Sequence, residues 1–139
     1  MATPAESRIR LVTGDITKLD IEAVVTAANE ALRGGGGVDG AVHRAAGPEL
    51  VKASRALAPC PTASAKIAPG FNLTAKYVIH AVGPVYNGKP QDDDQLASAY
   101  RTSLALAAEQ QVRTIAFPCI STGVYGFPKQ PACDVAIGA

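Results

Sequence analysis

Two glycine-bearing segments, each placed where an apolar strand should give way to a helix, constrain the fold of this chain most strongly. The first spans residues 34–37, which are consecutive glycines, and the second spans residues 121–126 with the sequence STGVYG. Because glycine has no Cβ, backbone N–H groups in such a loop can face a bound group closely, and the N-terminus of a following helix adds partial positive charge. Each loop suits a phosphate, and two facing loops indicate a diphosphate in a nucleotide-derived ligand.

Apolar runs alternate with segments of helical composition along the chain. The expected strands are residues 8–12, 22–28, 65–68, 76–82 and 114–119. The expected helices are residues 38–46, 48–57, 95–111 and a last helix that begins at Pro128, and residues 87–94 are expected to form a polar loop. Strands that alternate with helices indicate an α/β fold with a mostly parallel central sheet, in which ligands bind beyond the carboxyl ends of the strands. Both glycine segments lie at such ends.

Length and charge limit the classes of protein that fit. A chain of 139 residues is expected to be one domain that buries roughly two-thirds of its unfolded surface. Its formal net charge of +1 argues against a partnership with duplex nucleic acid, which needs clustered Lys and Arg. An anionic ligand is therefore expected to be held locally, by backbone amides.

The three cysteines, Cys60, Cys119 and Cys133, lack C-x-x-C spacing and predict neither a disulfide framework nor a zinc site. Cys119 is expected to be a buried thiol at the end of a strand. The N-terminus lacks the pattern of a secretory signal, and no apolar run approaches the length that spans a bilayer. We therefore expect a cytoplasmic protein with reduced thiols and no membrane partner.

Residues 35–40 formally match the dinucleotide-binding pattern G-x-G-x-x-G, but the match is weak. In that pattern the glycines follow a strand directly, and an acidic residue about twenty positions on holds the ribose. Here six residues separate Ala28 from the motif, and the region around Cys60 has no acidic residue. By the motif alone, the alternative is that the glycines are only a mobile connector.

Asn29 and Asp39 carry a sharper hypothesis. Asn29 leaves the end of an apolar strand and Asp39 opens the helix beyond the glycines, so the loop between them could bring an amide and a carboxylate to one ligand. The alternative is that Asn29 terminates the strand and Asp39 complements the helix dipole. His43, four residues after Asp39 on the same helical face, could orient its carboxylate or could simply be packed.

Three further residues have two interpretations each. Asp15 either binds a ligand or only ends a strand, and His80, inside an apolar strand, is interpreted as a core residue rather than a base. Tyr125 is either a platform for stacking or a lid on the core. The residues show no Ser-His-Asp or Cys-His arrangement for nucleophilic catalysis.

Taken together, these segments resemble the macrodomain family, and within it the MacroD-type ADP-ribosyl hydrolases. The matching segments are residues 14–17, 27–47, 77–84 and 117–126. The resemblance implies a three-layer α/β/α fold with a mixed, mostly parallel sheet. The run from Asn29 to Gly47 is far more specific than a chance glycine motif.

The resemblance also implies a role for individual residues. Asp15 would accept a hydrogen bond from the adenine amino group, assisted by the backbone N–H of Ile16. The residues that would line the distal ribose and its phosphate are Gly35, Gly36, Gly37 and Val38. The residues that would wrap the diphosphate are Ser121, Thr122, Gly123, Val124 and Tyr125. Asn29 and Asp39 match the catalytic positions, with His43 in support.

Two departures from the family pattern stand out. The family usually begins its Asn-Ala-Ala-Asn motif with asparagine, where this chain has Thr26, and we expect the support of the Asn29 loop to be altered. Macrodomains also generally continue with a further strand and helix beyond the position of Ala139. We therefore expect residues 1–139 to form a single macrodomain that lacks this strand and helix.

The activity that the resemblance implies is hydrolysis at the distal ribose of ADP-ribose. The expected substrates are proteins mono-ADP-ribosylated on acidic side chains and O-acetyl-ADP-ribose, with no cofactor and no metal. The alternative is a non-catalytic ADP-ribose reader, which needs the same pocket without the pair Asn29 and Asp39. An NAD-dependent oxidoreductase would need a substrate domain, for which 139 residues leave no room.

Overall fold

The computed structural model describes residues 8–32, 34, 37–123 and 125–139. In chain order its elements are the 3-10 helix η2 (Ile16–Lys18), β1 (Ala23–Ala27), α1 (Gly37–Ala46), α2 (Pro48–Leu57), β2 (Ala65–Pro69), β3 (Tyr77–Ala81), α3 (Pro90–Glu109), β4 (Ile115–Ala116) and α4 (Lys129–Gly138).

The four strands form one mixed sheet in the order β2-β3-β1-β4. β1 is parallel to both of its neighbours, with Val24 opposite Val78 of β3 and Ala116 of β4, while β2 runs antiparallel to β3. Four of the five residues of β1 are buried, as expected for an apolar, β-branched strand at the centre of a parallel sheet. The predicted α/β class with a mostly parallel sheet is confirmed.

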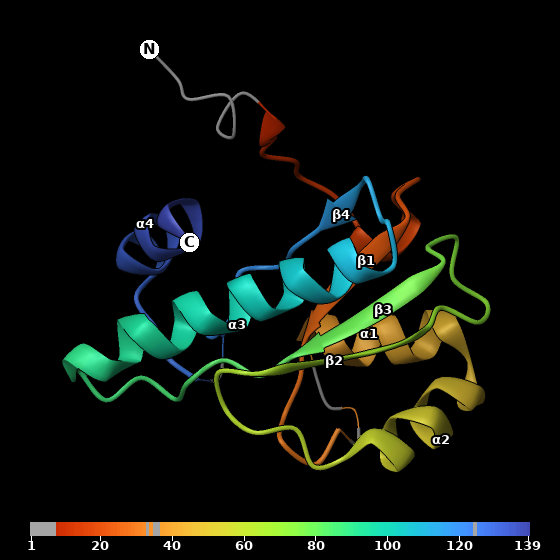
Figure 1. Cartoon of the computed structure of the whole chain (residues 1–139), viewed down its shortest axis with the longest axis horizontal. Helices are drawn as coiled ribbons and strands as arrows, with labels where there is room; N and C mark the ends of the chain where they lie inside the picture. Colours follow the sequence, from red (N-terminus) through yellow and green to blue (C-terminus); the bar gives the residue numbers. More distant parts are fainter. Residues whose placement is uncertain (1–7, 33, 35–36, 124) are drawn as a thin grey trace.

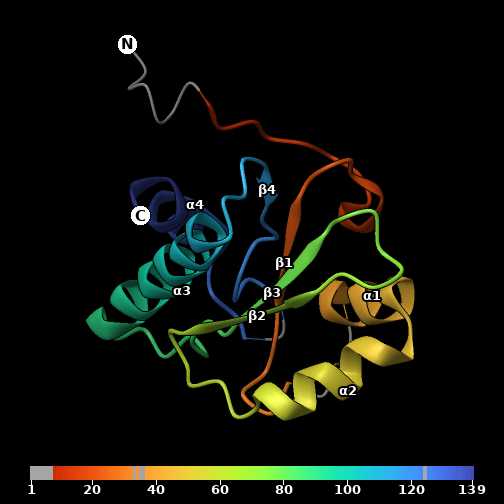
Figure 2. The same ribbon diagram turned by 45° about the vertical axis from the view of Figure 1, so that its right-hand side comes forward.

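Helices cover both faces of this sheet and produce three layers (Figure 1). On one face, Val25 and Ile79 pack with Leu96 of α3 and Ala132 of α4. On the other face, residues one position along the same strands pack with α1 and α2, so that Val24 contacts the cluster of Leu50. Figure 2 shows the two helix pairs on opposite sides of the strands. The α/β/α prediction is therefore confirmed.

The junction between α1 and α2 follows the sequence signals closely. Gly47 takes a positive φ of 93°, which L side chains rarely adopt, and Pro48 then begins α2 at a position where a missing N–H leaves no hydrogen bond unmade. Leu50 in this helix is fully buried, which contributes about 1.5 to 3 kcal/mol relative to exposure. The predicted helix over residues 48–57 is confirmed.

The predicted strand over residues 8–12 is wrong. These residues form no strand, and Leu11 is 90% exposed. Alternation of apolar and polar residues predicts which face of a strand is buried, but a strand also needs a neighbour that pairs its N–H and C=O groups. Among the described residues, the sheet consists of the strands β1, β2, β3 and β4, and residues 8–12 pair with none of them.

The start of α3 lies earlier than the sequence predicts. The polar segment 87–94 is expected to be a loop, but α3 begins at Pro90. The carboxylate of Asp92, in the first turn, accepts hydrogen bonds from the backbone N–H groups of Asn87 (2.8 Å) and Lys89 (3.2 Å). Acidic residues at a helix N-terminus satisfy unpaired N–H groups and complement the helix dipole, so the polar composition marks a capped start of the helix.

β4 covers only two residues of the expected strand 114–119, and this shortening moves Cys119. The thiol is predicted to be buried at a strand end, but it is exposed, because the strand stops at Ala116 and Cys119 lies in the segment beyond the sheet. Cys60 is buried, and its pKa is raised by that burial.

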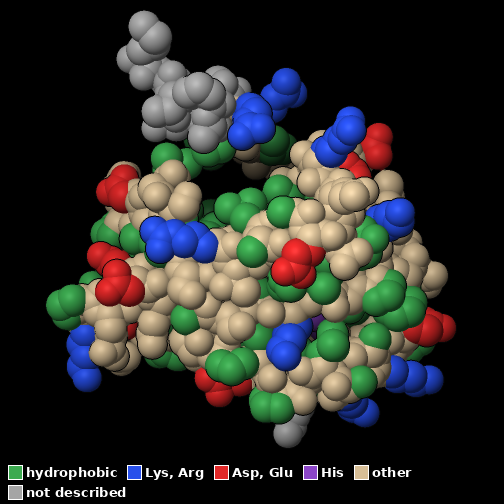
Figure 3. Space-filling model, in the orientation of Figure 1, with side chains coloured by type: hydrophobic (Ala, Val, Ile, Leu, Met, Phe, Trp, Pro, Cys, Tyr) green, Lys and Arg blue, Asp and Glu red, His purple; other side chains and the backbone are tan. Residues whose placement is uncertain are grey.

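The surface is mixed in charge. Figure 3 shows Lys and Arg side chains interspersed with Asp and Glu on the face that it presents. Within the described ranges, no helix combines the length and the apolar character needed to cross a membrane.

Candidate active site

The candidate site lies at the edge of the sheet where the parallel strands β1, β3 and β4 end. Ala28, after β1, donates its N–H to Ala81 O (2.9 Å), and Tyr86, after β3, donates its N–H to Tyr125 O (2.8 Å). Gly83 faces Ser121 so closely that a Cβ at this position would overlap the Ser121 hydroxyl. The segments that follow β3 and β4 are therefore packed closely together, and glycine is required at position 83 because it has no Cβ.

The first glycine segment is tied down at Asn29. The Asn29 side-chain amide donates a hydrogen bond to Gly34 O (3.2 Å), and the N–H of Leu32 donates to Asn29 O (3.1 Å). Gly34 has a φ of 82°, and a Cβ there would lie 3.3 Å from the His43 ring. Gly34 thus lies against α1, while the joint action of Asn29 and Asp39 on one ligand stays a prediction. Gly35 and Gly36 lie outside the described residues.

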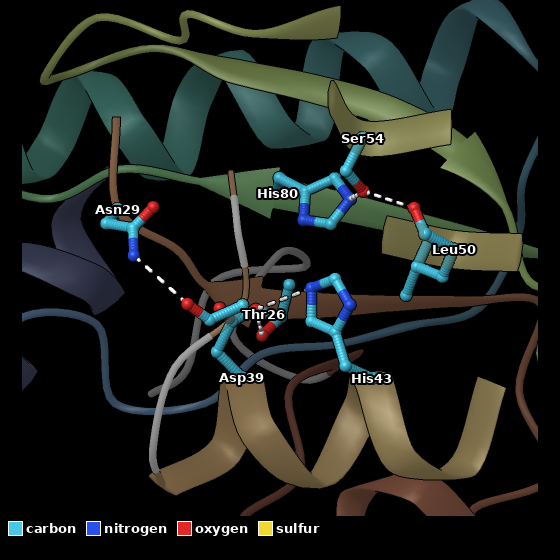
Figure 4. A network of polar contacts seen from close by, with 8 residues as sticks. Thr26, Asn29, Asp39, His43, Leu50, Ser54 and His80 are labelled. Atoms are coloured by element: carbon cyan, nitrogen blue, oxygen red, sulfur yellow. Dashed lines mark hydrogen bonds and ion pairs between the residues drawn. The ribbon is translucent and has the colours of Figure 1, made fainter. Parts of the chain in front are cut away.

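Asp39 is buried in the first turn of α1, with 4% of its surface exposed. Its Oδ1 accepts a hydrogen bond from Thr26 Oγ1 (2.9 Å) and lies 3.6 Å from His43 Nε2. Figure 4 shows these side chains converging from β1 and α1, with the Asn29 amide pointing toward the loop that leads into α1. Burial raises the pKa of Asp39, while the Thr26 hydrogen bond and the charge of His43 act in the opposite direction.

His43, predicted to orient Asp39, lies one turn further along α1 and is slightly more exposed than the carboxylate. Its separation of 3.6 Å from Asp39 is too long for a hydrogen bond, so it acts on the carboxylate electrostatically. Both ring nitrogens are buried without a hydrogen-bond partner among the described residues. The His43 ring also lies 5.8 Å from that of His80, centroid to centroid.

His80 is a fully buried core residue, as the sequence indicates. Its Nε2 lies 2.9 Å from Ser54 Oγ, which donates its single hydrogen to Leu50 O (2.7 Å). Ser54 must therefore accept from His80, so the proton of the neutral ring is on Nε2. Burial lowers the pKa of His80 to about 4, and His43 adds to this effect. The imidazole is neutral at physiological pH.

Asp39, His43 and His80 hold donor atoms within 4.8 Å of one another. A tetrahedral zinc ion with ligands at 2.0–2.1 Å would need donor atoms roughly 3.4 Å apart. The cluster is wider than such a site, and we assign no metal to it. Independence from metal stays a prediction.

The second glycine segment is a tight turn built from its own backbone. Ser121 has a φ of 67°, and its carbonyl accepts from Phe127 N–H (2.8 Å), while Gly123 O accepts from Gly126 N–H (3.0 Å). Thr122 is fixed by a hydrogen bond from its hydroxyl to Cys119 O (2.8 Å). The Ser121 hydroxyl is buried and has no partner in the described part of the chain. Val124 lies outside that part.

Asp15 and Ile16 have roles in the fold itself. Asp15 does not end a strand: it caps η2, its carboxylate accepting from Thr17 N (2.9 Å) and Thr17 Oγ1 (2.6 Å). These hydrogen bonds lower the pKa of Asp15. Ile16 packs against the apolar cluster that contains Val24 and Val42. Adenine recognition by Asp15 and Ile16 stays a prediction.

The contact of Thr26 is the feature that sequence reasoning missed. Thr26 is expected to affect the Asn29 loop, but its hydroxyl instead bonds to Asp39. A signal was present, since Thr26 is the one polar residue in the buried strand AVVTA. A buried hydroxyl needs a hydrogen-bond partner, and the sequence alone did not identify it.

Comparison with known proteins places this chain in a family. The Macro domain family profile matches residues 25–136. A Macro domain-containing protein of Ralstonia nicotianae is 62% identical over 130 residues, covering 93% of this chain and 76% of that protein. The ADP-ribose glycohydrolase MACROD2 of Xenopus laevis is 54% identical over 132 residues, and the match covers 94% of this chain but only 32% of MACROD2.

A solved structure agrees with these sequence matches. The Oceanobacillus iheyensis macrodomain with ADP superimposes with a TM-score of 0.86 at 44% identity, over 90% of this chain and 70% of that one. The predicted resemblance is therefore confirmed at the level of both sequence and fold. This chain belongs to the macrodomain family.

Proposed function

We propose that this protein binds ADP-ribose at the carboxyl edge of β1 and β4 and hydrolyses the ester that joins its distal ribose to an acidic side chain. O-acetyl-ADP-ribose, which carries a similar ester, is proposed as a second substrate. The partners are then ADP-ribosylated proteins, and the proposed location is the cytoplasm.

The observation that carries the proposal is the buried carboxylate of Asp39 beside the folded-back Asn29 loop. A carboxylate that only complements a helix dipole gains nothing from burial and would be more stable in water. Asp39 is instead 4% exposed, and burial raises its pKa. A raised pKa makes a carboxylate a better acceptor for a proton from water near neutral pH.

The second glycine segment supports a ligand with a diphosphate. Ser121 supplies a buried hydroxyl with no hydrogen-bond partner among the described residues, and Gly123 is exposed, with open space where a Cβ would lie. Phosphate oxygens accept hydrogen bonds from such hydroxyl and backbone N–H groups. The relative from Xenopus laevis is named an ADP-ribose glycohydrolase, and the Oceanobacillus iheyensis macrodomain was solved with ADP.

In the mechanism that we propose, Asn29 and Asp39 hold a water molecule against the ester. Asp39 accepts a proton as the water oxygen attacks, or orients the water while the ligand's own phosphate assists. The second glycine segment fixes the diphosphate, so that attack on the ester is close to unimolecular. The products are ADP-ribose and the free carboxylic acid. His43 supports the charge of Asp39 from 3.6 Å.

Release of ADP-ribose from a protein mono-ADP-ribosylated on glutamate tests the proposal. The expected result is release by the wild-type protein without added metal or cofactor. Calorimetry should also show tight binding of ADP-ribose and poor binding of adenosine, which lacks the diphosphate. A protein that binds ADP-ribose but releases none from the ester would be a reader, and similar affinity for both ligands would remove the argument from the two loops.

A further inference from the structure

Thr26 reaches from the central strand to the candidate catalytic carboxylate. Thr26 is fully buried in β1, and its Oγ1 lies 2.9 Å from Asp39 Oδ1 on α1. The contact joins residues that are 13 positions apart and lie on either side of the first glycine segment. It therefore fixes the start of α1 relative to the sheet at the place where the site is built.

The chemistry of the two groups sets the direction of this hydrogen bond. An ionised carboxylate only accepts, so the Thr26 hydroxyl donates to it. A hydrogen bond to the charged form stabilises that form and lowers the pKa of the acid. Threonine is branched at Cβ and has few χ1 rotamers, so a strand at the centre of the sheet holds this donor in a nearly fixed direction.

The other titratable groups near Asp39 do not supply this hydrogen bond. His43 on α1 is 3.6 Å away, beyond hydrogen-bond distance, and His80 on β3 is neutral, with a pKa of about 4. The remaining charged residues on the elements packed against α1 are exposed, namely Asp15 and Lys18 at η2 and Glu49, Lys52 and Arg55 on α2. Among these groups, His43 is the one whose charge acts on Asp39.

We propose that Thr26 is a positioning residue for the reaction: its hydroxyl aims one oxygen of Asp39 and stabilises the charged form of this buried carboxylate. The proposal rests on the proposed function of Asp39. Thr26 stands where the family usually has asparagine, and this departure from the family pattern contacts the carboxylate itself.

The proposal predicts a specific dependence on pH. Burial raises the pKa of Asp39, and the Thr26 hydrogen bond opposes that rise. Without the hydroxyl, the pKa of Asp39 should rise further, and a smaller fraction of the protein should carry the ionised form at mildly acidic pH. The acidic limb of the pH–rate profile should therefore move to higher pH.

The test compares Thr26→Val, which keeps the shape but removes the donor, with Thr26→Ser, which keeps the hydroxyl. For each variant and the wild type, ADP-ribose release is measured against pH. The side-chain carboxyl carbon of Asp39 is titrated by NMR, and ADP-ribose binding is followed by calorimetry. Should Thr26→Val not fold, Thr26→Ala removes the same donor and leaves only a small cavity.

The expected result is an upward shift of both the acidic limb and the Asp39 titration in Thr26→Val, with Thr26→Ser close to wild type and ADP-ribose binding retained. Equal loss at every pH together with lost binding or stability would assign Thr26 a structural role and overturn the proposal. Unchanged profiles in both variants would also overturn it.

The NMR titration separates failure of this inference from failure of the proposed function. If the wild-type protein releases no ADP-ribose, the hydrolase proposal fails, and the role of Thr26 in the reaction fails with it. The titration still decides whether the hydroxyl controls the ionisation of Asp39: a higher midpoint in Thr26→Val than in Thr26→Ser would retain that part, and equal midpoints would remove it.

Discussion

The two glycine segments lie at the same edge of the sheet, yet they offer a ligand different chemistry. Around the first segment, functional groups are side chains: Asp39 is buried and bonded to Thr26, and the amide of Asn29 is bonded to the loop itself. Around the second, the turn is held by backbone hydrogen bonds at Ser121 and Gly123. Under the proposed function, the first segment would serve the reaction and the second would serve recognition of the ligand.

Substitutions in the two segments should have different effects. Removing a side chain near the first segment should remove chemistry and leave the ligand in place, since under the proposed function the second segment holds the diphosphate. Adding a Cβ to the second segment should obstruct the ligand and leave the chemistry intact, since the reacting groups are elsewhere. The predictions that follow set these two expectations against each other.

The largest expected effect is that of Asp39→Ala. Turnover should fall by about a hundredfold or more, the range for a general base or a group that orients water. ADP-ribose should still bind, because the second segment is unchanged. Single-turnover release and calorimetry measure the two quantities separately.

Asn29→Ala is the matched variant for this experiment. It should behave like Asp39→Ala, and the losses should not add fully in the double variant, because both residues act on one water. Unchanged turnover in either single variant would move the active site away from this pair.

Gly123→Ala is expected to have the next largest effect, and on affinity rather than turnover. A Cβ at Gly123 has no neighbour within 4 Å among the described residues, so the fold should accept alanine, whereas a diphosphate held by the backbone should be displaced. The affinity for ADP-ribose should fall by about tenfold, or ~1.4 kcal/mol.

Gly138→Ala, which also has open space around its Cβ position but lies in α4, is the control for Gly123→Ala. Calorimetry should show wild-type affinity for it. Equal affinities in the two variants would mean that the second segment does not approach the ligand closely, and the contrast between the segments would be lost.

The sequence predicted the elements best where glycine and proline limit the backbone locally. The helix at 48–57 and the strand at 22–28 were placed closely, because Gly47 and Pro48 fix one boundary and a buried central strand has an apolar run as its sequence. The prediction of a strand over residues 8–12 is wrong because strand pairing depends on residues far away in the sequence. These residues do alternate between apolar and polar, but among the described residues no strand pairs with them.

At the site, the sequence identified positions but not contacts. Asn29, Asp39 and His43 were named from their spacing, and α1 does bring Asp39 and His43 to one face. The Thr26–Asp39 hydrogen bond was not predicted, because it depends on the distance between β1 and α1. That distance is set by packing across the sheet and is not encoded in the spacing of either segment.

Asp15→Ala should weaken ADP-ribose binding by a smaller factor than Gly123→Ala. Asp15 is exposed and already bonded to Thr17, so solvent competes for any hydrogen bond to adenine. The control is Thr17→Ala, which removes one hydrogen bond to Asp15 and keeps its carboxylate. If both variants lose equal affinity in calorimetry, the effect comes from the cap of η2 and not from adenine recognition.

The smallest expected effect is a gain in stability in Asp39→Asn. Since burial raises the pKa of Asp39 above its unfolded value, the unfolded state releases this proton at lower pH than the folded state does. The carboxylate therefore costs stability above its folded pKa, and this cost disappears as the pH falls toward 3.8. Asparagine carries no charge, and its oxygen can still accept from Thr26.

Urea unfolding at neutral pH should accordingly show Asp39→Asn to be more stable than wild type by about 0.5 kcal/mol, the lower end of the usual gain from a single stabilising substitution. The advantage should shrink on acidification, because the wild-type carboxyl then also becomes neutral, while turnover stays low at every pH. A stability difference that does not change with pH would mean that the buried charge of Asp39 does not cause it. The contrast between the first glycine segment, with its buried charge, and the second would then lose this support.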